Sequence, residues 1–201
     1  MKKQREKKGE ITMLINHQIN QNNKINQNSV KVEELEKRQE ILEDFAGGRI
    51  ITEETLEIFD KNTQPIENTL YRGYQLPINV LKPGLILKEW NGSSHWSINF
   101  QIARNFSRDI ESINDAYAEE IADELNISEN EARNLFVPVI LKMNGVSKGI
   151  RLYELLAALP FKTVFEKEKE ITTLGIDTTV IHVEKVKDGY GIYYLLEVEE
   201  I

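Results

Sequence analysis

Apolar residues recur at helical spacing soon after a polar N-terminal stretch. They lie one or two helical turns apart, at Val32, Leu35, Leu42 and Phe45. This spacing predicts a helix with one buried face, and Gly47 and Gly48 supply a C-terminal stop. A second short helix is predicted after Thr52, a good N-terminal cap, with Leu56 and Phe59 on its buried side. We expect these two helices to form a lid or platform ahead of the main domain.

After Asn68, short apolar runs alternate with Pro or Gly, a pattern typical of β-strands separated by turns. The predicted strands read TLYRGYQL, GLILKEW, VPVILKM, EKEITTL, TTVIHVEKV and GIYYLLEVEE. Helices are predicted at 99–107, at about 113–126, from Ser128 to Leu135, and over GIRLYELLAAL. Helices first, followed by a mixed, mainly antiparallel set of strands with helical insertions, favour the α+β class.

Residues 1–31 begin with a Lys-rich run and continue through the tract NHQINQNNKINQNS. This tract has too few apolar groups to offset the conformational entropy lost on ordering it. We therefore expect a flexible polar segment over 1–31, a helical region over 32–64 and the main domain over 65–201.

Composition narrows the classes of function. The 201 residues include no cysteine, which excludes disulfides and thiolate metal sites. His17, His95 and His182 show no paired ligand spacing, so a metal enzyme is not expected. The formal net charge of −8 argues against a general affinity for nucleic acid. No run approaches the ~18–20 apolar residues of a membrane helix, and no apolar signal core follows the basic start, so a cytoplasmic location is expected.

Arg72 stands inside an apolar strand with Gly73 behind it. The planar guanidinium suits a diphosphate, and a glycine lets a ligand approach the backbone closely. The alternative is an edge-strand arginine whose head lies in solvent.

A second segment, SHWSINFQIARNF, begins at residue 94 and places small hydroxyls beside an aromatic before turning into a helix. Such a turn offers hydroxyl donors and an aromatic face to a planar heterocycle. The alternative is a strand end in which Ser97 or Asn99 caps the helix. Trp96, Ile102 and Phe106 would then belong to the core.

The third segment contains Glu166, Glu168 and Glu170, which alternate with lysines at the start of a predicted strand. A period of two places all three carboxylates on one face, where they repel and raise a pKa or require a nearby cation. The alternative is the solvated face of a charged edge strand.

Together these segments resemble the arginine–serine–glutamate family of ADP-ribosyltransferase toxins and their relatives. In that family an aromatic-Arg-Gly strand, a Ser-x-Ser segment before a helix, and a Glu-x-Glu pair followed by an aliphatic residue occur in this order. The matching residues are Tyr71-Arg72-Gly73, Trp96-Ser97 with Ile102-Ala103 and Phe106, and Glu168-Lys169-Glu170-Ile171. The resemblance covers roughly 65–185 and implies a sheet of the ADP-ribosyltransferase type. In size, the chain is similar to small phage-encoded enzymes that modify host transcription and translation proteins.

The resemblance implies that NAD is bound as a substrate. Arg72 would grip its diphosphate, the backbone of Gly73 would bond the nicotinamide amide, and Phe106 would stack on the nicotinamide ring. Ser97 would be the last serine of the Ser-x-Ser element, which places His95 where the family has its first serine. That serine helps to hold the catalytic glutamate. Either His95 does so with an imidazole N–H, or Ser94 reaches in, or the enzyme is weakened.

The resemblance also implies roles for the acidic pair. Glu170 would bind the ribose and stabilise the oxocarbenium-like transition state, and Glu168 would orient and deprotonate an acceptor guanidinium. Glu166 and Glu168 form an alternative pair, but Ile171 supplies the aliphatic residue that should follow the catalytic glutamate. The turn from Pro160 to Lys167, with Phe161 and Phe165, would face the target protein.

The implied function is mono-ADP-ribosylation of arginine on a target protein, with release of nicotinamide. The expected target is a component of the host transcription or translation machinery. An NAD glycohydrolase is the alternative among enzymes. A catalytically inactive module that binds protein through the 32–61 helices is the alternative outside enzymes.

Overall fold

A computed structural model describes residues 32–46, 51–88, 93–109, 115–159 and 165–201. The predicted polar segment 1–31, the Gly47–Gly48 stop, and the predicted target-facing residues Pro160 and Phe161 lie outside the described residues. The side chain of Phe165, also predicted to face the target, is likewise not described.

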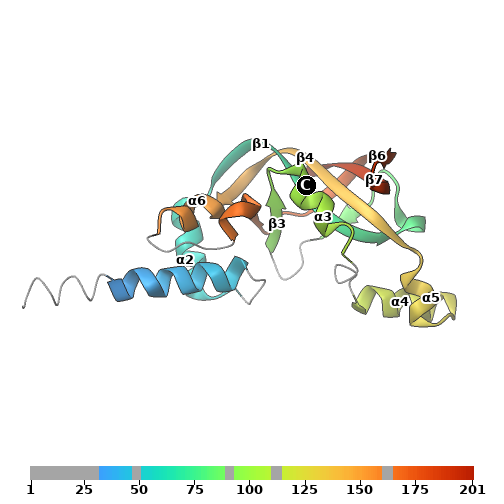
Figure 1. Cartoon of the computed structure of the whole chain (residues 1–201), viewed down its shortest axis with the longest axis horizontal. Coiled ribbons are helices and arrows are strands. Elements are labelled where there is room, and N and C mark those ends of the chain that lie inside the picture. Colours follow the sequence, from blue (N-terminus) through green and yellow to red (C-terminus); the bar gives the residue numbers. More distant parts are fainter. Residues whose placement is uncertain (1–31, 47–50, 89–92, 110–114, 160–164) are drawn as a thin grey trace, which may run out of the picture.

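Two helices precede the sheet (Figure 1). The first covers residues 32–46 and buries Leu42 and Phe45. The second, α2 (Glu53–Asn62), begins after Thr52, whose hydroxyl accepts the backbone N–H of Thr55. Phe59 is buried as predicted, but Leu56 is exposed. The buried line of α2 runs through Thr55 and Phe59, four residues apart, and Leu56 is rotated about 100° away from it.

Seven strands form one sheet. They are β1 (Gln64–Pro77), β2 (Ile86–Leu87), β3 (Ser93–Ser97), β4 (Phe136–Arg151), β5 (Glu170–Leu174), β6 (Thr178–Asp188) and β7 (Gly191–Glu200). Their order is β1-β3-β5-β4-β7-β6-β2, and β1 also pairs with β4. The pair β4–β7 is parallel and the other pairs are antiparallel. The predicted α+β class with a mixed, mainly antiparallel sheet is confirmed.

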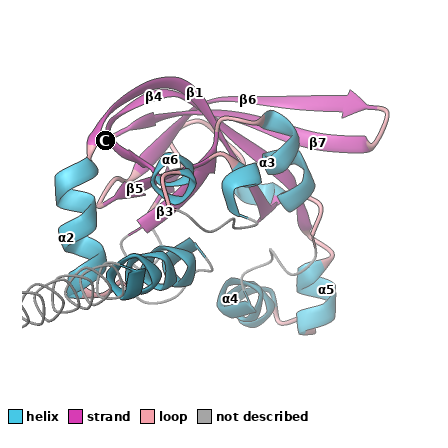
Figure 2. Cartoon of the chain, turned by 60° about the vertical axis from the view of Figure 1, so that its left-hand side comes forward, coloured by secondary structure: helices cyan, strands magenta, loops and turns pink. Residues whose placement is uncertain are grey.

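Four of these strands close on one another, because β1 pairs with β4 along most of its length while β3 and β5 bridge the two. Figure 2 shows the arched sheet with α3, α6 and the N-terminal helices on one side of it. The N-terminal helices and α6 pack together in one smaller cluster and α3 packs in another, whereas the main core is built mainly from residues of the strands. Its buried members include Leu70, Trp96, Leu141, Ile171 and Leu196.

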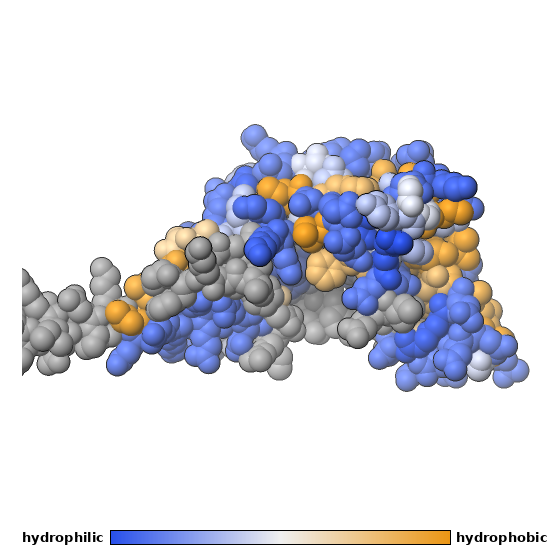
Figure 3. Space-filling model, viewed as in Figure 1, coloured by the Kyte–Doolittle hydropathy of each residue, from blue (hydrophilic) through white to orange (hydrophobic). Residues whose placement is uncertain are grey.

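The remaining helices are short: η1 (Ile78–Val80), α3 (Phe100–Phe106), α4 (Asp115–Leu125), α5 (Glu129–Arg133), α6 (Leu152–Ala157) and η3 (Phe165–Glu168). Asn99 caps α3, and Ser128 with Glu131 makes a capping box on α5. The space-filling view shows hydrophilic residues over the outer surface of α4 and α5 and apolar residues where this pair meets the sheet (Figure 3). No helix in the described ranges combines the length and apolar character needed to cross a membrane.

The third helix, α3, is attached to the sheet on two sides. Towards β1 it packs on Gly73, where an added Cβ would lie 2.1 Å from the carbonyl oxygen of Ala103. Towards the β6–β7 hairpin, the buried Arg104 donates to both carboxylate oxygens of Asp188, at 3.2 and 3.3 Å. The same guanidinium lies 4.4 Å from the ring centroid of Tyr193. These contacts fix the position of α3 against the sheet.

Candidate active site

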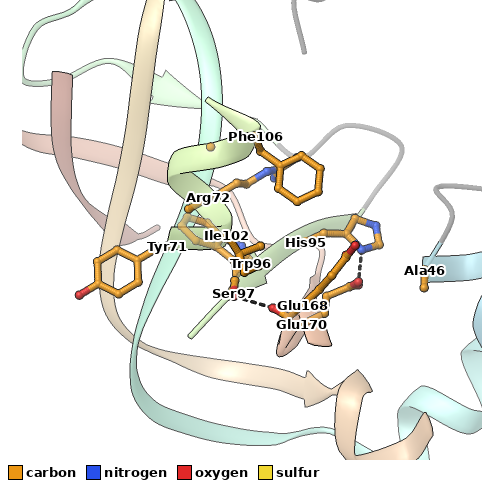
Figure 4. Close-up of a pocket in the computed structure, with 12 residues that line it drawn as sticks. Ala46, Tyr71, Arg72, His95, Trp96, Ser97, Ile102, Phe106, Glu168 and Glu170 are labelled. Atoms are coloured by element: carbon orange, nitrogen blue, oxygen red, sulfur yellow. Dashed lines mark hydrogen bonds and ion pairs between the residues drawn. The ribbon is translucent and has the colours of Figure 1, made fainter. Parts of the chain in front are cut away.

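A cavity of about 330 Å³ brings the three sequence segments together (Figure 4). Its volume lies in the range of small-molecule sites. It is lined by Ala46, Tyr71, Arg72, Gly73, His95, Trp96, Ser97, Ile102, Ala103, Phe106, Glu168 and Glu170. All seven of the predicted site residues are therefore in its wall: Arg72, Gly73, His95, Ser97, Phe106, Glu168 and Glu170.

The cavity begins where β1 and β3 separate. Within the described residues these strands pair at Tyr71 and Ser97 alone. Arg72 follows the paired position and spans the gap, since its Nη1 donates to Ser94 Oγ at 2.6 Å. Its guanidinium carbon also lies 4.5 Å from the ring centroid of Tyr74. Arg72 is thus a partly buried, oriented side chain and not an edge-strand arginine with its head in solvent.

The structure explains why position 73 is a glycine, for a reason that the sequence did not indicate. Besides the Ala103 oxygen, an added Cβ would lie 2.5 Å from the backbone nitrogen of Ser107. The space that a side chain would need is occupied by α3, so a glycine is required for the helix to approach the strand. The bond from the Gly73 backbone to nicotinamide stays a prediction.

The second segment divides between core and cavity. Trp96 is buried in the main core, as the alternative of a capped strand end predicted, and it also lines the cavity. Phe106 lines the cavity too but is 49% exposed, so it is not a core residue. Ser97 Oγ donates to the carbonyl of Glu168 at 2.6 Å and accepts the backbone N–H of Asn99 at 2.9 Å. Ser97 therefore ties the end of β3 to the segment that carries the acidic pair.

The prediction that the glutamates share one strand face is wrong. Glu168 ends the 3-10 helix η3, and β5 begins at Glu170. Lys169 between them is a turn residue with φ of 52°, a left-handed conformation that is not that of a strand. Both carboxylates still line the cavity, one from a turn and one from a strand. The side chain of Glu166, the alternative partner, is not described.

Glu170 is nearly buried and has two polar partners. His95 Nδ1 lies 2.5 Å from its Oε1, and Thr172 Oγ1 donates to the same oxygen at 3.0 Å. Ser94 instead contacts Arg72, so the residue that contacts Glu170 is His95. The sequence missed Thr172, which is fully buried. Its position two residues after Glu170 on one strand was a usable signal, because side chains at that spacing share a face.

The N-terminal helix contributes to the same site. The ring of Phe45 lies 5.0 Å from the His95 ring, centroid to centroid, at an interplanar angle of 39°. The next residue, Ala46, lines the cavity. Phe45 also packs edge-on against Phe59 at 4.6 Å. No local pattern in the sequence links this helix to His95.

The pKa of the Glu168 carboxyl is raised in the folded protein. Burial is the main cause, the neighbouring Glu170 carboxylate adds to it, and His95 opposes it. A carboxylate with a raised pKa binds a proton more readily, which suits a general base. Within the described ranges, no group of three or more His, Cys, Asp or Glu side chains is placed to hold a metal ion.

Comparison with known proteins gives structural similarity alone. No family model matches the sequence, and no curated protein does. Among solved structures, the chain is similar to the ADP-ribosyltransferase Vis in complex with agmatine, with 15% identity and a TM-score of 0.44 over 69% of this chain and 51% of that chain. It is also similar to Plx2a, an ADP-ribosyltransferase toxin from Paenibacillus larvae, with 11% identity and a TM-score of 0.42 over 74% of this chain and 70% of that chain. The match spans about half the length of the Vis chain.

Proposed function

We propose that the protein is a mono-ADP-ribosyltransferase that cleaves NAD and transfers ADP-ribose to arginine on another protein. The observation that carries the proposal is the convergence of three separate segments on one cavity. Arg72, Ser97 and the pair Glu168 and Glu170 come from three separate segments of the sequence but line the same cavity of about 330 Å³. These are the residues by which the sequence resembles the arginine–serine–glutamate family.

NAD would bind with its diphosphate near Arg72. A guanidinium can bond two phosphate oxygens at once, and the contact with Ser94 helps to fix its direction. The exposed ring of Phe106 would stack on the nicotinamide, and the backbone of Gly73 would bond the amide group. Figure 4 shows the glutamates on one side of the cavity and Phe106 on another, so a nicotinamide riboside placed between them contacts both.

Glu170 would act on the bond that breaks. The C1′–N bond of NAD ionises, its electron pair leaves with the nicotinamide, and positive charge develops on the ribose. A carboxylate held beside that charge lowers the barrier, and it acts best when it needs no reorganisation. The contacts of Glu170 with His95 and Thr172 supply this fixed orientation.

Glu168 would act on the acceptor. A guanidinium is a poor nucleophile until it loses a proton, and the Glu168 carboxylate can take that proton as an arginine nitrogen attacks C1′. The products are ADP-ribosylarginine, nicotinamide and one proton, which passes to solvent. The target is proposed to be a protein of the host transcription or translation machinery, modified in the cytoplasm.

Labelled NAD with agmatine, and then with a host lysate, tests the proposal. The wild type should release nicotinamide and label both acceptors. Glu170→Gln should lower nicotinamide release by ~10²–10³-fold, because it removes one electrostatic contact with the transition state. Glu199→Gln is a matched control, since Glu199 is exposed on β7. Release of free ADP-ribose without labelling would identify a glycohydrolase, and NAD binding without turnover an inactive binding module.

A further inference from the structure

A second cavity adjoins the first. It measures about 280 Å³ and is lined by Ile102, Asn105, Phe106, Asp109 and Glu168. Three of these residues, Ile102, Phe106 and Glu168, also line the first cavity. Glu168 and Phe106 therefore stand between two spaces, one of which contains Glu170 and Arg72.

We propose that this second cavity receives the side chain of the acceptor arginine, and that Asp109 determines the specificity for it. The inference rests on the function proposed above. If Glu168 deprotonates the acceptor while NAD fills the first cavity, the acceptor must reach Glu168 from its other side. The second cavity provides that approach.

The lining matches a guanidinium in charge and shape. Glu168 and Asp109 bring two carboxylates, and none of the five lining residues is cationic. A guanidinium is planar, carries five N–H donors and pairs with carboxylates through two parallel bonds. It also stacks well on an aromatic face, which Phe106 offers. A cation here would offset the repulsion between the carboxylates of Glu168 and Glu170.

The backbone of Asp109 is fixed in place. Its N–H donates to the carbonyl of Phe106 at 3.2 Å, and its carbonyl accepts Gln75 Nε2 at 2.6 Å. Gln75 is itself buried in β1. These bonds anchor the turn after α3 independently of the Asp109 carboxylate, so the side chain can be changed without removing them.

The remaining polar residue of the cavity has a different role. Asn105 Oδ1 accepts the side-chain amide of Gln101 at 2.9 Å, one helical turn earlier on α3. This bond engages its acceptor oxygen within the helix. A charged carboxylate is also a stronger acceptor for a cation than an amide oxygen, so Asp109 and Glu168 are the main candidates to bind the guanidinium.

The test separates acceptor binding from NAD cleavage. Asp109→Asn keeps the size of the side chain and removes its charge. With NAD saturating, the KM for agmatine should rise about 10-fold or more, because a hydrogen bond to a charged group is lost. The KM for NAD and the rate of NAD hydrolysis without acceptor should stay within about twofold of the wild type. Asp109→Glu should retain most of the affinity for agmatine, and Asp123→Asn, on the exposed side of α4, should match the wild type.

Two results would overturn the inference. An unchanged KM for agmatine in Asp109→Asn would show that the carboxylate does not bind the acceptor. A raised KM for NAD in the same variant would assign the second cavity to the nucleotide. Failure of the proposed function would look different, since the wild type would then not transfer ADP-ribose to agmatine. Should Asp109→Asn not fold, Asp109→Ala makes the same test, because it also removes the charge and does not touch the backbone bonds of Asp109.

Discussion

His95 Nδ1 lies 2.5 Å from Glu170 Oε1, so an imidazole contacts the glutamate at the position where the resembled family places a serine. The register of the β3–β5 pair explains how the imidazole reaches this glutamate. His95 lies opposite Thr172 in the β3–β5 pair, and Thr172 bonds the same carboxylate. The two contacts approach Glu170 from neighbouring strands and restrict its orientation.

His95→Ala should lower the rate of nicotinamide release by about 10-fold or more, because a bond to an ionised, buried carboxylate is worth ~1.5–3 kcal/mol. His95→Ser should retain more activity than His95→Ala, since a hydroxyl can still donate. Single-turnover release of nicotinamide is the measurement, with thermal unfolding as the check on folding. A folded His95→Ala protein with the rate of the wild type would show that the imidazole does not orient Glu170.

Glu168→Gln should lose transfer to arginine and retain a slow hydrolysis of NAD, because the proposed task of Glu168 concerns the acceptor. Nicotinamide release and agmatine labelling should be followed on the same sample. An equal fall in both activities would contradict the division of roles between Glu168 and Glu170.

The same substitution, Glu168→Gln, should reduce activity but not the free energy of unfolding. The folded-state pKa of Glu168 is raised, so its contribution to stability is present below the pKa of the unfolded state and is lost as the pH rises through the folded pKa. At neutral pH the charged carboxylate opposes folding. Urea unfolding at pH 7 should therefore find Glu168→Gln at least as stable as the wild type, and a less stable variant would contradict the raised pKa.

Phe45→Leu should slow NAD cleavage more than its effect on stability implies. Phe59→Leu is the matched control, because both phenylalanines are buried in one cluster and touch each other, while Phe45 contacts His95. Each substitution should cost about 1–3 kcal/mol of unfolding free energy. At a temperature where both variants are folded, the Phe45 variant should have the lower kcat for nicotinamide release. Equal kcat values would show that Phe45 contributes to the core and not to NAD cleavage.

Asp188→Asn should weaken the attachment of α3 in a pH-dependent way. The hydrogen bonds from Arg104 hold the pKa of Asp188 below its ordinary value. A lowered folded pKa gives stability that is present above the unfolded pKa of ~3.9 and that is lost as the pH falls through the folded value. Urea unfolding should show the wild type to be more stable than the variant at neutral pH, with the difference shrinking in acid. A difference that does not depend on pH would contradict the ionic contact.

The sequence predicted those parts of the fold that depend on local patterns. Apolar runs predicted strands at six of the seven places where the sheet has them, but β3 (Ser93–Ser97) was not among them, and residues 149–151, predicted as the start of a helix, end strand β4. The capping residues Thr52, Asn99 and Ser128 lie at helix starts in the structure. The prediction that the glutamates share one strand face was wrong because the alternation of Glu and Lys has the period of a strand, whereas the left-handed backbone at Lys169 interrupts the strand. Solvent-exposed charged residues fit a turn as well as a strand, so their spacing alone does not distinguish the two.

Contacts between distant segments could not be predicted in the same way. Phe45 lies 50 positions before His95, and Arg104 lies 84 positions before Asp188. Neither pair follows from a period of two or of 3.6, because each depends on how whole elements pack. The convergence of Arg72 with Glu170 was predicted through the family resemblance and not through spacing.

The double attachment of α3 has a mechanical consequence. A helix that packs against Gly73 on one side and is held by Arg104 on the other cannot slide along the sheet without breaking tight packing or a partly buried ionic contact. It acts as a rigid reference for the residues at its end. Phe106 is half exposed at that end, so we expect its side chain to change rotamer more readily than the helix axis shifts.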